Sequence, residues 1–248
     1  MTPSYHSIAY AGFEVANPVS LAAIEAAAAR TELAPGARVI DIGAGAGGVS
    51  VALARTFGFQ VEAVERYPQM ATMIRDRAAE AGVADRVSVI AEDSATALDR
   101  LPPADLIVAL GSTEAAGAGI RSPSEIFARL AKSLTSPGWL LWGDLTWRGE
   151  PPEPLRQVIG VTGDYANHEG WLQAAAHAGL EVISAERAPD EDWDAFFGGA
   201  DARVRAWLDA HPDDPAAPAI RARADLTRTT FDFGRQWLSF GLYLFRKP

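Results

Sequence analysis

The sequence predicts an α/β fold in which a mostly parallel sheet is covered by helices on both faces. Three observations support this prediction. One stretch passes from an apolar strand pattern through a glycine-rich turn into a helix start, strand-like and helix-like segments alternate along the rest of the chain, and the strand-like segments number seven. Alternation of this kind is typical of doubly wound sheets, in which a helix connects each pair of parallel strands.

The stretch 39–54, VIDIGAGAGGVSVALA, is the strongest single signal. It begins with an apolar run interrupted only by Asp41, as expected of a buried parallel strand. Four glycines follow: Gly43, Gly45, Gly47 and Gly48. A glycine-rich turn between a strand and a helix lets the backbone approach a ligand closely and aims amide N–H groups at it. Asp41 puts a carboxylate beside that ligand.

The other elements follow in order. Further strands are expected at 60–65, 86–91, 104–110, 139–144, 180–187 and 240–246, and helices at 18–31, 68–81, 94–98, 122–133 and 167–178. Asn17 is expected to cap the first of these helices, with Pro18 at its first position. The chain is interpreted as a single domain, 1–248, with an N-terminal lid and helix at 1–34. Residues 188–239 form an insertion before the last strand, expected to be a helical cap with a turn at 212–218.

Composition limits the function. A net charge of −10 disfavours a phosphate backbone as substrate, so a small molecule is expected as partner rather than nucleic acid. The chain has no cysteine and four scattered histidines, which argues against a metal site. No apolar run approaches the ~20 residues of a membrane span, and the first residues do not resemble a signal peptide. We expect a soluble, cytoplasmic protein, either monomer or homodimer.

Glu65 ends the second strand, about 20 residues after the glycines, where a carboxylate can accept both ribose hydroxyls of an adenosine. A solvated acid at a strand end is the alternative interpretation. Gly43, Gly45 and Gly48 also satisfy the G-x-G-x-x-G pattern of a dinucleotide site, so the glycines do not identify the ligand by themselves.

Together these features resemble the class I S-adenosylmethionine (SAM) dependent methyltransferases, whose motif I has this strand, turn and helix. The resemblance covers nearly the whole chain. It implies a Rossmann-like sheet of seven strands with an antiparallel last strand, SAM as cofactor and S-adenosylhomocysteine (SAH) as product. The cofactor-binding residues that it implies are Asp41, Gly43, Ala44, Gly45, Gly47, Glu65, Arg66, Asp93, Ser94 and Gly111.

Asp93 and Ser94 match a pair that this family often has after strand three, an acidic residue followed by a small one. In the family, the acidic side chain binds the adenine amino group, and the backbone N–H of the next residue contacts the adenine ring. Asp93 could instead cap the helix that starts at Ser94.

The details resemble a group of small bacterial methyltransferases of unassigned substrate. The shared segments are H-x-I-A…E-V-A-N-P (His6, Ile8, Ala9, 14–18), G-x-T (Gly111, Thr113), the pair Trp147-Arg148, and W-L-x-x-H-P-D-D (207–214). Relatives tend to carry G-E-x-x-W after strand five, where this chain has Asp144, an acid one methylene shorter.

Methyl transfer from a sulfonium is an in-line displacement that requires alignment and exclusion of water, and a base only if the acceptor carries a proton of high pKa. The candidate catalytic residues are Asp144, Glu114 and His168, with His6 as a further possibility. Asp144 is preferred because it ends a strand and is rigidly held, although it could equally orient another group. A capping role is the alternative for His168.

The loops after strands four and five face the transferring methyl group in this fold. Candidate acceptor-binding residues are Tyr10, Thr113, Trp147, Tyr165 and Trp193; ordinary core packing is the alternative for the aromatic ones. Two other functions stay open. One is a SAM-using enzyme that does not transfer a methyl group, and the other is a nucleotide-binding protein or nicotinamide oxidoreductase.

Overall fold

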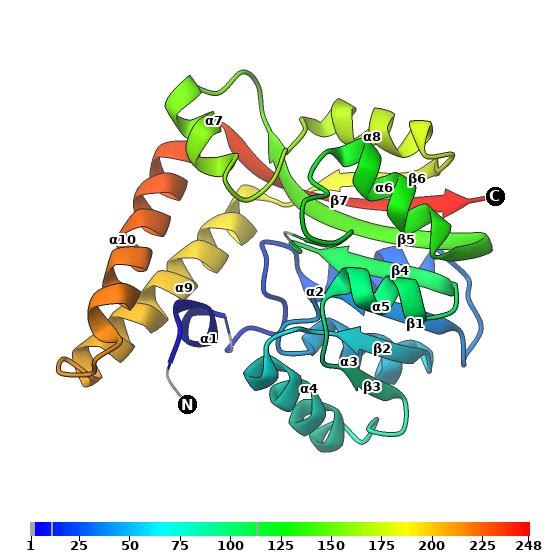
Figure 1. Ribbon diagram of the computed structural model, residues 1–248, viewed down its shortest axis with the longest axis horizontal. Helices are drawn as coiled ribbons and strands as arrows, with labels where there is room; N and C mark the ends of the chain where they lie inside the picture. The colour runs from blue at the N-terminus through cyan, green and yellow to red at the C-terminus, as the bar shows by residue number, and fades with distance from the viewer. Residues whose placement is uncertain (1–2, 11, 113) are drawn as a thin grey trace.

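The computed structural model describes residues 3–10, 12–112 and 114–248. Its centre is a seven-stranded sheet of order β3-β2-β1-β4-β5-β7-β6 (Figure 1). The strands are β1 (Arg38–Ile42), β2 (Gln60–Val64), β3 (Val87–Ile90), β4 (Ala104–Leu110), β5 (Leu134–Trp147), β6 (Glu181–Arg187) and β7 (Leu238–Lys247). The first five are parallel, and β7 runs antiparallel to both β5 and β6. The predicted Rossmann-like sheet with an antiparallel last strand is confirmed.

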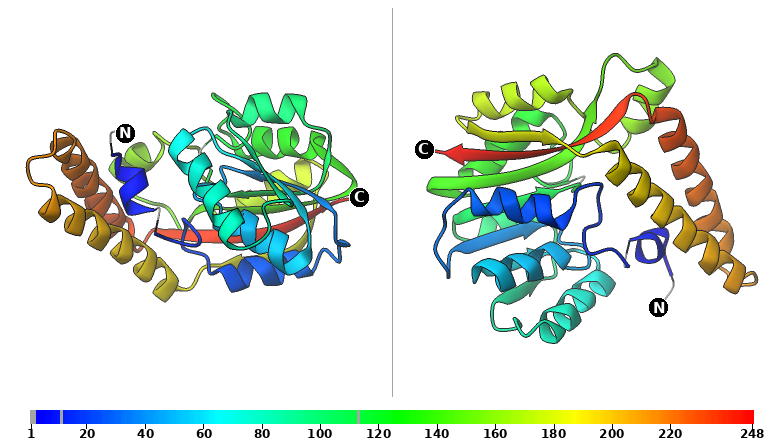
Figure 2. Two further views of the ribbon diagram at one scale, coloured as in Figure 1. Left: turned by 90° about the horizontal axis from the view of Figure 1, so that it is seen from below. Right: turned by 180° about the vertical axis from the view of Figure 1, so that it is seen from behind.

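Helices cover both faces of this sheet because its strands are apolar on both sides. One face packs on α2 (Leu21–Ala29), α3 (Gly48–Phe57) and α4 (Pro68–Glu80), and the other on α5 (Ser94–Arg100), α6 (Pro123–Lys132) and α8 (His168–His177). Figure 2 shows α2 and α3 from behind, opposite the α6 and α8 of Figure 1. Side chains along β1 alternate between the two cores, with Val39 in the first and Ile40 in the second.

Strand β5 is longer than its parallel neighbours because β7 pairs with it along residues 138–147. The register runs from Gly138 opposite Lys247 to Trp147 opposite Leu238. This antiparallel ribbon extends beyond the last paired residue of β4, Leu110, which lies opposite Gly143. Residues 144–147 therefore project past the carboxyl edge of the parallel strands.

The segment between β6 and β7 forms two long helices, α9 (Asp190–Ala210) and α10 (Ala217–Gly234), as predicted for the cap. The short helix α1 (Tyr5–Ala9) packs against both of them (Figures 1 and 2). This contact is a small apolar cluster: Tyr5, Ala9, Ala200, Val204, Leu208, Ala217, Ile220 and Ala224. A further helix, α7 (Glu153–Ile159), follows β5 and contacts α10. Neither α1 nor α7 was predicted from the sequence.

The predicted start of the first long helix is wrong. Helix α2 begins at Leu21, and its N-cap is Ser20, whose side chain accepts from the Ala23 amide. Asn17 is buried and engaged elsewhere: its side chain accepts from the Val19 amide (3.1 Å) and donates to the Leu110 carbonyl (3.5 Å). A contact with β4, distant in sequence, therefore replaces the local capping contact.

The other boundaries agree to within a few residues, apart from strand five, which is longer at both ends than predicted. Among the described residues, no helix is long and apolar enough to cross a membrane.

Candidate functional site

The glycine turn between β1 and α3 has the backbone geometry that only glycine adopts without strain. Gly43, Gly45 and Gly47 have φ values of 71°, 56° and 81°, in the left-handed region. The three have different surroundings. A Cβ atom at Gly47 would lie 2.9 Å from Ile74 of α4, whereas at Gly45 the nearest heavy atom would be 4.0 Å away. Gly47 is thus required by packing, while Gly45 borders open space.

Four backbone amides of this turn donate hydrogen bonds to other groups of the protein, which corrects the expectation that they point freely at a ligand. The Gly43 and Ala44 amides donate to the Val64 carbonyl, and the Gly47 amide donates to the Ala44 carbonyl. The Gly45 amide donates to Glu65 Oε2 at 3.0 Å. The turn therefore offers a ligand close backbone approach and shape rather than these four donors.

Two buried carboxylates hold the turn in position. Asp41 accepts a hydrogen bond from Ser50 Oγ at 2.5 Å, and burial raises the pKa of Asp41 to about 6. Glu65 also accepts from the Tyr67 amide at 2.8 Å, and burial raises its pKa as well. Glu65 is therefore not the solvated acid of the alternative interpretation; it is buried and links the end of β2 to the glycine turn.

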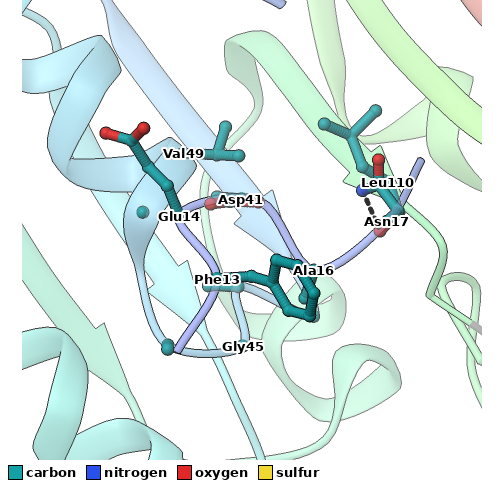
Figure 3. A pocket seen from close by; sticks show the side chains of 12 residues that line it. Phe13, Glu14, Ala16, Asn17, Asp41, Gly45, Val49 and Leu110 are labelled. Carbon is teal, nitrogen blue, oxygen red and sulfur yellow. Dashed lines mark hydrogen bonds between the residues drawn. The ribbon is translucent and has the colours of Figure 1, made fainter. Parts of the chain in front are cut away.

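The N-terminal segment 12–17 lies directly over the glycine turn. Phe13, Glu14, Ala16 and Asn17 share a small cavity with Asp41, Gly43, Ala44, Gly45, Ala46, Gly48, Val49 and Leu110 (Figure 3). A Cβ atom at Gly48 would lie 1.7 Å from the Glu14 carbonyl oxygen, so the segment touches the start of α3. The cavity has a volume of about 40 Å³, far below the ~300 Å³ or more of typical ligand pockets. The segment therefore leaves only a small cavity above the turn.

The residues expected at the adenine end form a connected group. Asp93 caps α5, accepting from the Thr96 amide at 3.0 Å and from its hydroxyl at 2.7 Å. Ser94 Oγ donates to the Glu114 carbonyl, and the Glu114 carboxylate pairs with Arg66. Glu114 thus lies with the β2 and β3 ends rather than beside Asp144.

Asp144 lies beyond the end of β4, in the projecting part of β5. Its side chain is 7% exposed and accepts a hydrogen bond from the Leu145 amide at 2.8 Å. In the described part of the chain no cation forms an ion pair with it. Burial, opposed only partly by that hydrogen bond, raises the pKa of Asp144 to about 7.

Three of the predicted residues lie on the loop after β5 and at the start of α8, and one of them, Tyr165, is shown to be near Asp144. Tyr165 is close enough for the Asp144 charge to add to the rise in its pKa, which burial dominates. His168 begins α8, with Asn167 as the actual N-cap, and its Nδ1 lies 3.2 Å from the hydroxyl of Tyr243. Trp147 is buried and donates from Nε1 to the Tyr165 carbonyl at 3.0 Å. Trp147 thus anchors the loop that carries Tyr165.

Of the remaining candidates, Tyr10 packs against the cap and Trp193 lies within it, whereas Gly111 follows β4. Tyr10 stacks on Phe196 of α9, with ring centroids 5.6 Å apart. Trp193 is 2% exposed and packs against Phe197 and Phe231 within the cap. Gly111 has a φ of 72°, and its amide donates to the Gly143 carbonyl at 2.7 Å. Thr113 lies outside the described residues.

Sequence reasoning missed some residues of the site. Asn17, Ala46, Gly48, Val49 and Leu110 line the cavity, and Tyr243 lies between His168 and the region of Asp144. Gly48 and Val49 stand inside the glycine stretch and could have been included on spacing alone. The long-range contacts of Asn17 and Tyr243 carry no local signal, because their partners lie 93 and 75 positions away.

Comparisons with known proteins agree on one family. A family model described as precorrin methyltransferase domain matches residues 18–142. The uncharacterized protein YjhP of Escherichia coli K12 is 30% identical over 213 residues, 84% of each chain. A SAM-dependent methyltransferase of Geobacter sulfurreducens, solved with SAH, superposes with a TM-score of 0.84 at 26% identity, covering 99% of this chain and 98% of that one. The corresponding SAH complex from Thiobacillus denitrificans gives 0.83 at 26% identity over 100% of both chains.

The glycine turn gives a matched pair of substitutions. Gly45→Ala and Gly47→Ala both introduce a Cβ at positive φ, a cost of about 1 kcal/mol, but only the second also meets Ile74. We expect Gly47→Ala to lose a further 1–3 kcal/mol or so of unfolding free energy to overpacking. Gly45→Ala should stay folded, but its Cβ should block the approach of SAH to the backbone of the turn. We expect calorimetry to show SAH binding at least about tenfold weaker than in the parent, which corresponds to a loss of roughly 1.4 kcal/mol or more. Parent-like SAH affinity of Gly45→Ala would contradict this assignment.

Burial of Asp144 predicts a pH-dependent stability. Its pKa is about 7 in the folded protein, against an ordinary value of 3.8, so the ionised form is penalised by folding. That penalty is absent below about pH 4, grows through pH 7 and is complete above it. The free energy of unfolding of Asp144→Asn should therefore exceed that of the parent by an amount that grows between pH 5 and pH 8. The upper limit is about 4 kcal/mol, because each of the roughly three units of difference in pKa is worth about 1.4 kcal/mol. Urea unfolding at several pH values measures this gain, and Asp209→Asn, at an exposed position, is the control. A stability difference between Asp144→Asn and the parent that does not grow with pH would contradict the prediction.

Proposed function

The chain belongs to the precorrin methyltransferase domain family and is a SAM-dependent methyltransferase, and from this premise we propose that it methylates a small organic acceptor bound beyond the ends of β4 and β5. Asp144 is the proposed general base. The observation that carries the proposal is the state of the Asp144 carboxyl in the projecting part of β5. It is buried, it has no ion-pair partner among the described residues, and its pKa is about 7. A base of pKa near the working pH is the most effective.

The residues at the glycine turn fit the cofactor. Gly45 borders open space at the cavity, and Asp41 and Glu65 stand beside it as buried carboxylates. We propose that Asp41, Gly43, Ala44 and Gly45 contact the bound cofactor, that Glu65 accepts its ribose hydroxyls, and that Asp93 and Ser94 lie toward its base. Gly47 would support the turn through its packing on Ile74, and Arg66 and Gly111 would border the site. When bound, SAM supplies a methyl group already activated by the positive sulfur.

The chain's own residues then have two tasks. The first is to hold the acceptor in line and keep water out, for which Tyr10, Thr113, Trp147, Tyr165 and Trp193 are the proposed lining residues. The second is to accept a proton from an acceptor atom that carries one, the role proposed for Asp144. Glu114, paired with Arg66, is proposed to shape the cofactor side, and His168 is proposed to act behind Asp144 rather than on the acceptor.

A direct experiment combines binding with turnover. The protein is incubated with isotopically labelled SAM and panels of small acids, phenols, amines and tetrapyrrole precursors, and methylated products are detected by mass. Asp144→Asn should bind SAH like the parent and lose turnover by ~100-fold or more. Equal turnover of the two proteins would remove the base role. Failure of the parent to bind SAH in calorimetry would overturn the cofactor site.

We further propose that segment 12–17, together with the cap, opens to admit ligands and closes over them. Support comes from the small cavity beneath this segment and from the packing of α1 on α9 and α10. SAH should increase protection of backbone amides in 12–17 and in 188–239 against hydrogen exchange. Gly48→Ala, whose Cβ would meet the Glu14 carbonyl, should reduce protection of 12–17 in the absence of ligand. No change in either segment with SAH would rule out a lid.

A further inference from the structure

Gly241 of β7 leaves room for the ring of Tyr243 to lie back over its own strand. A Cβ atom at Gly241 would stand 2.4 Å from the Tyr243 hydroxyl oxygen and 2.3 Å from ring atom Cε2. The hydroxyl therefore occupies the position that a side chain at residue 241 would take. Gly241 and Tyr243, two residues apart on one strand, point to the same face.

That position is directly opposite Asp144. Asp144 and Gly241 are register partners across the β5–β7 ribbon, and opposite residues of an antiparallel pair point to the same face with Cβ atoms about 4.5–5.5 Å apart. The Tyr243 hydroxyl is thus within side-chain reach of the Asp144 carboxyl. Burial raises the pKa of Tyr243 to about 12, and the charge of Asp144 adds to this rise.

On its other side the hydroxyl meets His168. Nδ1 of His168 lies 3.2 Å from the Tyr243 hydroxyl, and the two ring centroids are 5.4 Å apart. His168 is the first residue of α8 and is partly exposed, whereas Asp144 is 7% exposed. Burial and the charge of Arg187 lower the pKa of His168, which favours its neutral form. In the tautomer that carries its proton on Nε2, Nδ1 can accept a hydrogen bond.

We propose that Tyr243, seated on Gly241, is a positioning residue that links the Asp144 carboxyl to the His168 imidazole and so provides the path by which Asp144 exchanges its proton with solvent. The inference rests on the proposed function of Asp144 as a base. A buried base that has taken a proton must release it before the next turnover, and the relay performs that release.

The proton count balances along this path. The acceptor's proton passes to the Asp144 carboxylate as the acceptor's lone pair forms the bond to the methyl carbon and the carbon–sulfur bonding pair stays on sulfur. Asp144 then returns the proton to the Tyr243 oxygen while the Tyr243 hydroxyl proton moves to His168 Nδ1. His168 loses a proton from Nε2 to water, and exchange with solvent restores the starting tautomer. Each of the three groups ends as it began.

Other groups face this path from the surrounding elements. Tyr165, before α8, is influenced by the charge of Asp144 and, in the opposite sense, by that of Arg121. Arg187 of β6 acts on both Tyr243 and His168. Thr146 lies on the same face of β5 as Asp144, and its hydroxyl interacts with that of Tyr243 and lowers the Tyr243 pKa. Tyr165 is the matched control, because its hydroxyl pairs with Thr162 at 2.9 Å instead of with His168.

The test requires no acceptor. The chain has four histidines, so the ring signals of His168 can be followed by NMR in isotope-labelled protein and assigned by their loss in His168→Gln. In the parent we expect two titration steps, one for the imidazole itself and one at about pH 7 that reports ionisation of Asp144. Asp144→Asn, Tyr243→Phe and Gly241→Ala should each lose the second step, and Tyr165→Phe should keep it.

The outcomes separate the relay from simpler explanations. Persistence of the second step in Tyr243→Phe would mean that His168 senses Asp144 through space, and its persistence in Asp144→Asn would mean that another group titrates; either result overturns the relay. Calorimetric SAH binding by each variant shows that it is folded. If the relay is detected but Asp144→Asn retains methyl transfer, the base role fails while the hydrogen-bonded path stands.

Discussion

The pairing of β5 with β7 is the constraint on which the rest of this structure depends. It is the longest ladder of the sheet, and it continues past the ends of the parallel strands. By extending β5, it carries Asp144 beyond the carboxyl edge on a rigid support. The same register sets Gly241 opposite that carboxyl. Rigid support matters for the proposed role of Asp144 as a base, because catalytic groups must be held to within about 0.5 Å of their working geometry.

The proposed site consists of two halves, one proposed for the cofactor and one for the acceptor, that differ in construction. The cofactor half uses the carboxyl ends of β1, β2 and β3, where a glycine turn is held by Asp41 and Glu65. Its contacts are mostly between consecutive elements of the chain. The acceptor half uses the antiparallel ribbon and the loop before α8, joined by Trp147, whose indole donates to the Tyr165 carbonyl. Its contacts join segments far apart in the sequence.

This difference explains what the sequence could and could not predict. The turn at 43–48, the strands around it and the two cap helices follow from local patterns of glycine and apolar residues, and the structure has them. The hydrogen bonds made by the turn amides were not predictable, because Gly45, for example, donates to a carboxylate 20 residues away. Asn17 is a good helix cap by composition, yet it contacts Leu110 of β4. Tyr243 reads simply as an apolar position in the last strand until the register with β5 is known.

The cap also has an unusual relation to the sheet. Its chain leaves β6 and re-enters β7, which are hydrogen-bonded neighbours, with Arg187 opposite Gly241. The Ala188 amide donates to the Phe240 carbonyl at 2.8 Å, so the two ends of the insertion are tied together at the sheet. A short turn could close the same gap, and the entropic cost of a longer connection grows only slowly with its length. A connection of another length between the same two ends would therefore keep β6 paired with β7, while the contacts of α9 and α10 with α1 and with the segment over the glycine turn would be lost.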